Sequence, residues 1–363
     1  MKSKSHASFL YLAALATACI SPQLFAITVT DLRPTGALGG TNTNNAITWS
    51  WGVGNGSFTA VGEAQVSSGF LHAFVDSSSD GSGIVDLGTL GGPGSYAAGY
   101  ATNYTTNKSY IAGSAMINDN DWRAFICEDD GTPTLVNLGT LGGSFSWGVA
   151  VNPSGTVVGW SETSTPGITH SFIYSGGVMT DIGGNFGPAD ISASGVVVGV
   201  AETSMSEIHA ARYSGGTITD LGTLGGSYSH AYGIDDSGGI VGTSTDSNGI
   251  SLAFLYDGET MINLGTLPDD WGSHAWAVNS ASEVVGFSFY GSDSERAFIY
   301  SGGIMYNLET LAADYMVPEG GSGHGFTRLR EARDINNDGY IVGSGDYWDG
   351  AEITKRAFVL RYY

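Results

Sequence analysis

The sequence predicts an all-β protein built from one short unit that is repeated seven times. Three marks recur in a fixed order. The first is an acidic or amide residue before an aliphatic one, as in Asp220-Leu221, and the second is an aliphatic run that ends in glycine, as in Val241-Gly242. The third is a small residue before phenylalanine, as in Ala253-Phe254, which is replaced once by Ala210-Ala211. Because three independent marks keep their order throughout, we infer one repeated architecture.

The length of the repeat indicates four strands in each unit. Successive first marks lie 39 to 55 residues apart, which brackets the ~40–45 residues of a four-stranded propeller blade. Short β-branched and aromatic runs bounded by Gly, Asn and Ser are typical of strands and hairpins, and no sustained helical period appears. In the repeat that begins at Asn263, we expect strands at residues 274–278, 283–289, 296–300 and 304–308.

The two ends of the repeat array complement each other. The segment from Ile27 to Leu32 has a fourth-strand pattern with no strands before it, and the segment from Arg356 to Leu360 has a third-strand pattern. We therefore predict a seven-bladed β-propeller of four-stranded blades, closed by the N-terminal strand completing the last blade. Closure removes exposed strand edges. A differently closed propeller or an open solenoid, which needs caps at both ends, is the alternative.

Residues 1–26 have the order of a secretory signal peptide. Lys2 and Lys4 precede an apolar run over residues 9–20, and Ala26 is a small residue before the expected cut. We therefore expect residues 27–363 to form a single propeller domain that is secreted or extracellular, or else periplasmic. Lipoprotein cleavage before Cys19 is the alternative. After cleavage at Ala26 the remaining cysteine, Cys127, lies in an apolar strand pattern and is expected to be buried.

Composition and charge exclude several classes of protein. Hydrophobic residues make up 42% of the chain, far above what a disordered acidic tail carries. Acidic residues outnumber basic ones 35 to 13, giving a formal charge of −22, which disfavours nucleic acid and anionic lipid as partners. Removal of Lys2 and Lys4 with the leader changes this charge by two units, to −24. No second long apolar segment appears, so we expect a soluble monomer with no integral membrane segment.

The repeat motif resembles that of a known family. Leu-Gly-Thr-Leu-Gly-Gly, then serine and an aromatic residue, then Val-Val-Gly, then a small residue and Phe, is similar to the HAF family of bacterial extracellular repeat proteins. His72-Ala73-Phe74 carries the motif literally, and the resemblance covers residues 27–363. It implies export and a repeat-built β architecture. It carries over no catalytic residues.

Candidate ligand-binding residues follow the glycine-rich links between repeats. In a propeller these links lie on one face, where binding loops gather on a rigid scaffold. Aromatic side chains there offer apolar faces with polar tips, which suit a sugar or a peptide, whereas packing between neighbouring blades is the structural alternative. The candidates are Tyr96, Phe145, Trp147, Tyr228, His230, Trp271, His274 and Trp276.

The last link contains two further candidate sites. Arg328 and Arg330, followed by Arg333, would suit an anion because guanidinium groups make forked hydrogen bonds; pairing with nearby acids is the alternative. Residues 334–339 match the first half of a calcium loop, but Gly345 stands where the liganding Glu would be. The repeat accounts for these residues more simply as a turn between the first two strands, although weak calcium binding stays open.

Three histidines precede the small-residue mark, at His72, His170 and His209. They belong to different repeats and would not converge on the ~2 Å ligand distances of zinc, so we predict a structural role and no metal or other cofactor. No nucleophile motif appears.

We therefore predict an exported non-enzymatic binding module for a glycan or protein partner. The alternatives are a carbohydrate-active hydrolase or lyase that uses two carboxylates at the channel mouth, and a structural surface component.

Overall fold

The computed structural model describes residues 29–31, 47–53, 59–77, 83–129, 133–291 and 294–361. The predicted signal peptide, with Cys19 and Ala26, lies outside these residues. The regular structure of the described chain is almost all β-strand, which confirms the predicted all-β class. A short helix α1 (Leu308–Leu311) and a 3-10 turn η1 (Ala313–Tyr315) interrupt the strands in the last link. No helix within the described residues is long and apolar enough to cross a membrane.

Most strands form antiparallel sheets of four strands that are consecutive in sequence. Four sheets follow this pattern: β2 (Ile47–Val53), β3 (Ala60–Gln65), β4 (Leu71–Asp76) and β5 (Ile84–Gly88); β6 (Ser95–Asn103), β7 (Lys108–Met116), β8 (Trp122–Glu128) and β9 (Val136–Asn137); β10 (Gly142–Val151), β11 (Val157–Thr163), β12 (Thr169–Ser175) and β13 (Val178–Gly183); β22 (Gly272–Val278), β23 (Val284–Phe289), β24 (Arg296–Ser301) and β25 (Ile304–Asn307).

Two further groups of four strands are joined by one parallel pair, Ile208 with Tyr228, into an eight-stranded sheet. These strands are β14 (Phe186–Ile191), β15 (Val197–Glu202), β16 (Ile208–Ser214), β17 (Thr217–Asp220), β18 (Gly225–Ile234), β19 (Ile240–Asp246), β20 (Ser251–Tyr256) and β21 (Met261–Gly265).

The last sheet combines both ends of the described chain. Strands β26 (Gly325–Ile335), β27 (Tyr340–Trp348) and β28 (Ile353–Arg361) are completed by β1 (Val29–Asp31), in which Val29 pairs with Leu360. The predicted pairing of the N-terminal strand with the last repeat is therefore present.

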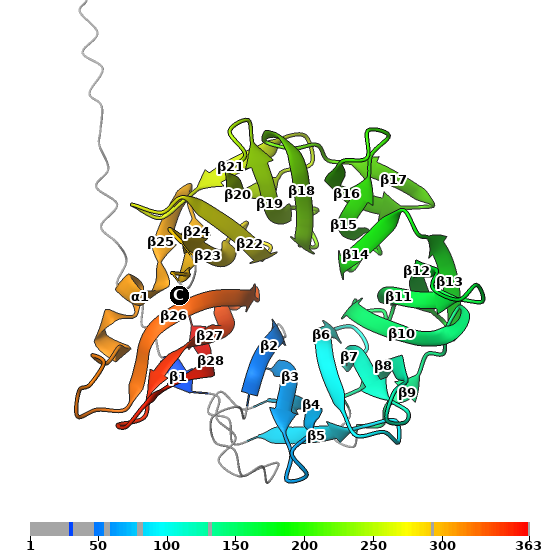
Figure 1. Cartoon of the computed structure of the whole chain (residues 1–363), viewed down its shortest axis with the longest axis horizontal. Helices are drawn as coiled ribbons and strands as arrows, with labels where there is room; N and C mark the ends of the chain where they lie inside the picture. The colour runs from blue at the N-terminus through cyan, green and yellow to red at the C-terminus, as the bar shows by residue number, and fades with distance from the viewer. Residues whose placement is uncertain are drawn as a thin grey trace, which may run out of the picture.

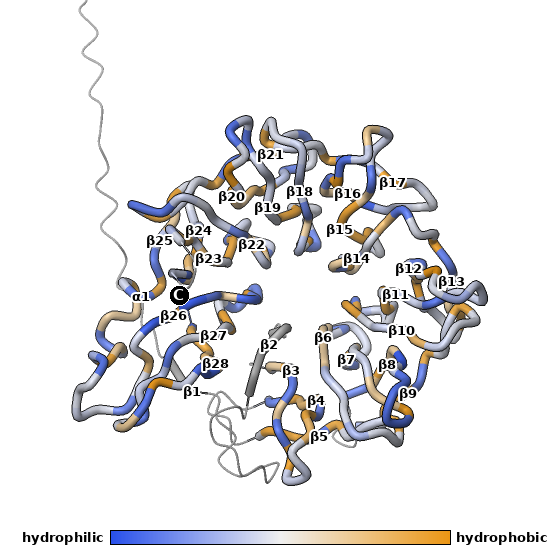
Figure 2. Tube along the Cα trace, viewed as in Figure 1, coloured by the Kyte–Doolittle hydropathy of each residue, from blue (hydrophilic) through white to orange (hydrophobic). Residues whose placement is uncertain are grey.

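The sheets stand around a central opening, with β2, β6, β10, β14, β18, β22 and β26 innermost (Figure 1). Hydrophobic stretches alternate with hydrophilic ones within each sheet (Figure 2). The buried clusters draw side chains from neighbouring sheets, as where Val241 packs with Ala275 and Phe298. The core is consequently a series of layers between sheets.

The second and third sequence marks have one packing explanation. A Cβ on Gly242 would lie 1.9 Å from the carbonyl oxygen of His230 on the neighbouring inner strand, so only glycine fits there. The phenylalanine of the third mark pairs across from that glycine, as Phe254 does with Gly242. The side chains of Phe74, Phe125, Phe172, Phe254, Phe298 and Phe358 are all fully buried.

A serine bridge fixes four of the glycine-rich links to their sheets. The Ser229 hydroxyl accepts a hydrogen bond from the Ala210 amide at 2.7 Å and donates one to the Gly222 carbonyl at 2.5 Å. Ser95, Ser146 and Ser273 make the same two contacts in their own repeats. The glycines of the links therefore belong to ordered crossing turns.

The predicted strand limits agree with the structure in the repeat from Asn263, where the observed strands begin and end within two residues of the expected ones. Cys127 is fully buried on β8, as predicted.

Candidate ligand-binding cavity

Each inner strand from β6 to β26 carries a bulge of one extra residue at an equivalent place, and β10, β18 and β26 have further register shifts. The pairing register shifts by one residue at the same place in every case, for example between Ala231 and Gly233 on β18. Such a β-bulge re-aims the side chain of its extra residue. The residues at these bulges are Ala98, Val149, Ala189, Tyr232, Trp276 and Arg333.

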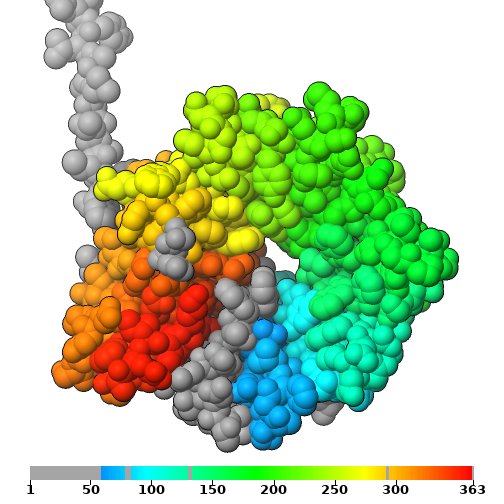
Figure 3. Space-filling view, viewed as in Figure 1, coloured from blue at the N-terminus to red at the C-terminus, as the bar shows by residue number. Residues whose placement is uncertain are grey.

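All six bulge residues line one central cavity of about 490 Å³. Those on β6, β10 and β14 are small, whereas those on β18, β22 and β26 are Tyr232, Trp276 and Arg333. The cavity therefore exists because three bulky side chains face three small ones. Figure 3 shows the molecule hollowed at this position in the centre of the ring.

The bulky wall forms a continuous stack. The ring centroid of Tyr232 lies 4.0 Å from that of His230 and 4.5 Å from that of Trp276. The Arg333 guanidinium carbon lies 4.4 Å from the centre of the Trp276 ring, a cation–π contact. The Trp276 indole nitrogen is buried and has no hydrogen-bond partner among the described residues. The wall thus combines aromatic faces with an unsatisfied donor.

Burial holds His230 and Tyr232 of this wall in uncharged forms. It lowers the pKa of His230 to about 4, with a smaller contribution from the charge of neighbouring His274. Burial likewise raises the pKa of the Tyr232 phenol. Both side chains are therefore neutral near pH 7. The Arg333 guanidinium is paired with the Glu331 carboxylate at 2.5 Å.

An aromatic group also supports the opposite side. Trp147 stacks on Trp122 with centroids 5.0 Å apart, and Tyr96 lies 5.7 Å from Trp147. Burial raises the pKa of Tyr96 to about 12, so its hydroxyl stays protonated. Trp160 lines the cavity and is 41% exposed, which leaves part of its surface available to a ligand.

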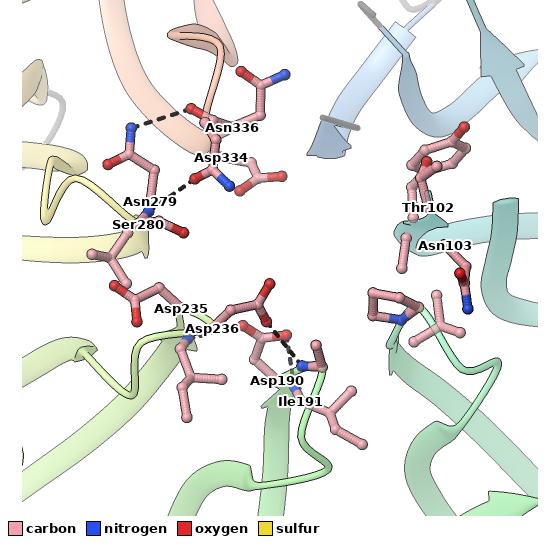
Figure 4. Close-up of a pocket in the computed structure, with 18 of the residues that line it drawn as sticks. Thr102, Asn103, Asp190, Ile191, Asp235, Asp236, Asn279, Ser280, Asp334 and Asn336 are labelled. Atoms are coloured by element: carbon pink, nitrogen blue, oxygen red, sulfur yellow. Dashed lines mark hydrogen bonds between the residues drawn. The ribbon is translucent and has the colours of Figure 1, made fainter. Parts of the chain in front are cut away.

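The other end of the channel is acidic. A second cavity of about 400 Å³ is lined by Asp190, Asp235, Asp236 and Asp334, which face Thr102 and Asn103 across the opening (Figure 4). Asp190 and Asp334 line both cavities and so mark the passage between them.

Asp190 has a strongly perturbed carboxylate. Its oxygens accept hydrogen bonds from the amides of Ile191 at 2.7 Å and Ile234 at 2.9 Å. Burial nevertheless raises the pKa of Asp190 to about 7, and the negative charge of Asp236 adds to this effect. The group is therefore partly protonated near neutral pH.

The structure gathers some of the predicted ligand-binding residues and separates others. Tyr96, His230 and Trp276 line the cavity. Trp147 lies behind Tyr96, and the Tyr228 hydroxyl is 3.5 Å from the His230 ring nitrogen.

Two of the candidates are placed differently. His274 forms a 2.7 Å hydrogen bond with the Thr243 hydroxyl and stacks on Phe287, so its contacts are those of blade packing. Trp271 is 69% exposed and lies outside the cavity lining.

The predicted arginine cluster is paired with acids, the alternative to an anion site. Arg330 donates to Glu295 at 2.8 Å and to Asp346 at 2.7 Å. Arg328 donates to the Glu295 carbonyl at 3.1 Å. Among these arginines only Arg333 lines the cavity.

The three marked histidines lie in different sheets, and each has an acidic partner. His72, His170 and His209 each contact an aspartate of the adjacent strand, at 3.0, 2.8 and 2.9 Å. Residues 336–339 form the predicted turn, in which Asn336 accepts hydrogen bonds from the amides of Asp338 and Tyr340. In the part of the chain that the structure describes, no three His, Cys, Asp or Glu side chains converge as a metal site.

The sequence reasoning missed Tyr232, Trp160 and Asp190 as cavity residues. The available signal was the position three residues after the bridging serine, which varies between Ala98, Val149, Tyr232 and Trp276 while its neighbours keep the repeat pattern. A position that varies within a constant frame is typical of a binding surface.

No protein-family model matches the chain. No curated protein matches it either. Among solved structures it is similar to a puromycin-hydrolysing peptidase of Mycobacterium tuberculosis, with 13% identity, a TM-score of 0.51, and coverage of 86% of this chain and 53% of the peptidase.

Two further similar structures have lower scores. TolB of Acinetobacter baumannii shares 12% identity at a TM-score of 0.44, with coverage of 68% of this chain and 62% of TolB. The β-propeller domain of the Trilobed protease of Pyrococcus furiosus shares 10% identity at a TM-score of 0.37, with coverage of 72% of this chain and 97% of that domain. The chain spans well under two thirds of the peptidase and of TolB. Together with the arrangement of the sheets around the central opening, the similarity to the peptidase shows a propeller-like all-β fold and nothing about activity.

Proposed function

We propose that the chain is a seven-bladed β-propeller, closed by β1, that binds a ligand in its central cavity. The eight-stranded sheet divides into two antiparallel groups of four that share one parallel pair, which supports counting them as two blades. The pairing of Val29 with Leu360 supports closure at the last blade. We count it with the HAF-type exported repeat proteins on its motifs and on the leader pattern of residues 1–26.

The binding proposal rests on one observation, the uneven distribution of large and small bulge residues around the channel. The six equivalent positions on β6 to β26 would fill or empty their part of the channel evenly if they served packing alone; β2 has the same register shift, between Ser50 and Gly52. Instead Tyr232, Trp276 and Arg333 occupy one half, and alanine or valine occupies the other. Concave sites with aromatic walls and few polar groups are typical ligand sites. The ligand we propose is a glycan or a peptide.

A binding array tests this proposal. Trp276→Ala should weaken binding to whichever glycan or peptide the native protein retains by at least about tenfold, because buried aromatic contacts dominate such sites. The matched control is Tyr290→Ala, which removes an exposed aromatic ring that lies outside the cavity. Retention of no glycan or peptide, or equal binding by the native protein and Trp276→Ala, would contradict the proposal.

A second function is favoured by the carboxylates of the passage. Glycoside hydrolysis uses one carboxylic acid that stays protonated and one that is ionised. Asp190, with its pKa raised to about 7, fits the acid, and Asp334 lines the same passage. The alternative is therefore a carbohydrate-active hydrolase or lyase. Release of reducing ends from a polysaccharide by the native protein, lost in Asp190→Asn, would establish it; no release by the native protein would exclude this function for the substrates tried.

A further inference from the structure

The link between β13 and β14 is shorter than its equivalents. Ser229 follows Asp220 by nine positions, whereas Phe186 follows Asp181 by only five. These two positions correspond, because Phe186 pairs with Ala201 as Ser229 pairs with Ser244. Four residues of the glycine-rich link are thus missing from this repeat alone.

The missing residues remove a contact that the link makes with the second strand in other repeats. In other repeats the leucine of the link lies over the second strand, where the amides of Leu141 and Leu224 each donate to a serine hydroxyl at 2.8 Å. On β15 the place of that serine is taken by Ala201, and the short link contains no leucine. This repeat therefore lacks both partners of the contact, the leucine of the link and the serine of the second strand.

A cavity of about 220 Å³ lies at this place. Gly184 and Asn185 of the short link line it, together with Glu202 and Ile208. It meets the central cavity at three residues that line both, namely Trp160, Gly187 and Val200. The two cavities are consequently adjacent, with the partly exposed indole of Trp160 at their junction. Together they are called the groove, which leads from the central channel toward the shortened link.

The backbone bordering this groove is unsuited to an extended peptide. A peptide of that kind adds a strand to a free sheet edge. Every inner strand from β6 to β26 carries its bulge where it borders the central cavity, and a bulge interrupts the hydrogen-bonding ladder. A ligand in the groove then contacts side chains and not the backbone ladder. Aromatic side chains with polar tips suit sugar rings.

The charges of the chain and of the cavity wall favour an uncharged ligand. The formal charge of −22 repels anionic chains. The bulky wall offers His230 in its neutral form and Arg333 already paired with Glu331. A cationic ligand would instead be drawn to the acidic cavity at the other end of the channel.

We infer that this groove binds a linear, uncharged oligosaccharide, with one end in the central cavity and the rest leaving over Trp160 through the shortened link. This inference rests on the proposed binding function and adds the ligand class and its direction. Two sites in series predict that affinity grows with chain length.

Calorimetric titration tests the inference with cello-, malto-, xylo- and chito-oligosaccharides of two to six units. At least one series should bind, and its hexamer should bind at least about tenfold more tightly than its dimer, because the second cavity adds contacts. A variant with Thr-Leu inserted after Gly183 and Gly-Ser after Gly184 restores the link seen at residues 222–227. It should bind the dimer as the native protein does and lose the gain with length.

A point variant keeps the test decisive if the insertion impairs folding. Trp160→Ala should weaken binding of the hexamer by about tenfold or more, whereas Tyr290→Ala should leave it unchanged. Binding that does not grow with length, or that grows equally in the restored-link variant, would overturn the inference and leave the proposed function standing. Absence of binding by every series would overturn the inference, while retained peptide binding on the array would still support the proposed function.

Discussion

At the residue scale, the repeat is defined by a few positions at which the backbone geometry permits only one type of residue. The glycine after each aliphatic run faces a carbonyl oxygen of the inner strand. Its replacement would place a Cβ only 1.8 Å from that oxygen at Gly199 and 2.0 Å at Gly343. The regular recurrence of this glycine in the sequence therefore has a steric origin.

We expect Gly242→Ala to lower the free energy of unfolding by about 3 kcal/mol or more, because the added methyl group overlaps a backbone carbonyl that side-chain rotation cannot relieve. Urea denaturation measures this change. Gly323→Ala is the control, since a Cβ there has only an ordinary 3.6 Å contact with Val317. Equal stability of the two variants would show that the steric explanation is wrong.

The buried histidines give stability a pH dependence of definite sign. The pKa of His230 falls from 6.5 in the unfolded chain to about 4 in the folded one. Between these values the unfolded state binds more protons, so the contribution to stability is complete above pH 6.5 and is lost as the pH falls toward 4. His274, whose pKa burial also lowers to about 4, acts in the same direction. Asp190 opposes both, because its pKa is raised.

We therefore expect His230→Phe to lose less thermal stability than the native protein as the pH falls from 7 to 4. The phenyl ring keeps the stacking on Tyr232 and removes the ionisation. Measuring the melting temperature of both proteins at each pH cancels the opposing contribution of Asp190, which they share. A difference in melting temperature that stays constant across this range would contradict the assigned pKa.

At the element scale, the group of strands β14 to β17 exchanges one core residue for another. Its third strand has Ala211 where other repeats have phenylalanine, and its first strand has Phe186 where other repeats have the bridging serine. Both side chains belong to the same buried cluster. The first strand thus supplies the aromatic ring that the third strand lacks, which compensates the lost volume.

This exchange predicts a compensating pair of substitutions. Phe186→Ser should cost about 3–5 kcal/mol of unfolding free energy, as large-to-small changes in cores do. Ala211→Phe alone should also destabilise, by overpacking. The double variant should be more stable than the sum of the two changes implies, which a double-mutant cycle measures directly. Simple additivity would show that the two residues do not share a site.

The sequence predicted the strands and turns better than it predicted the cavity. The reason is physical. Strands, turns and buried glycines follow from local steric constraints that recur in the repeats. Motifs such as Val241-Gly242 and Ala253-Phe254 therefore predict them. The cavity depends on which side chain occupies each bulge, and the strand pattern of a repeat does not by itself reveal a one-residue bulge. Tyr96 and His230 were found because they follow the links, whereas Tyr232 and Asp190 lie further along the inner strands and were missed.

At the scale of the whole molecule, the proposed closure depends on the three-residue strand β1. Its pairing with β28 completes the last sheet. We expect that deletion of residues 27–33 lowers the melting temperature by several degrees or more, because it exposes an edge of β28. The same protein lacking only residues 1–26 is the control. An unchanged melting temperature would rule out closure by this strand.

The asymmetric cavity is the central claim, and filling it is its most direct test. Ala189→Trp places an indole at the small side of the bulge ring without removing any contact of the bulky wall. The measurement is calorimetric titration of the ligand selected by the array into the native protein and into Ala189→Trp, with melting temperatures recorded for both. We predict at least about tenfold weaker binding by the variant with its folding retained. Unchanged affinity in a folded Ala189→Trp variant would contradict the account.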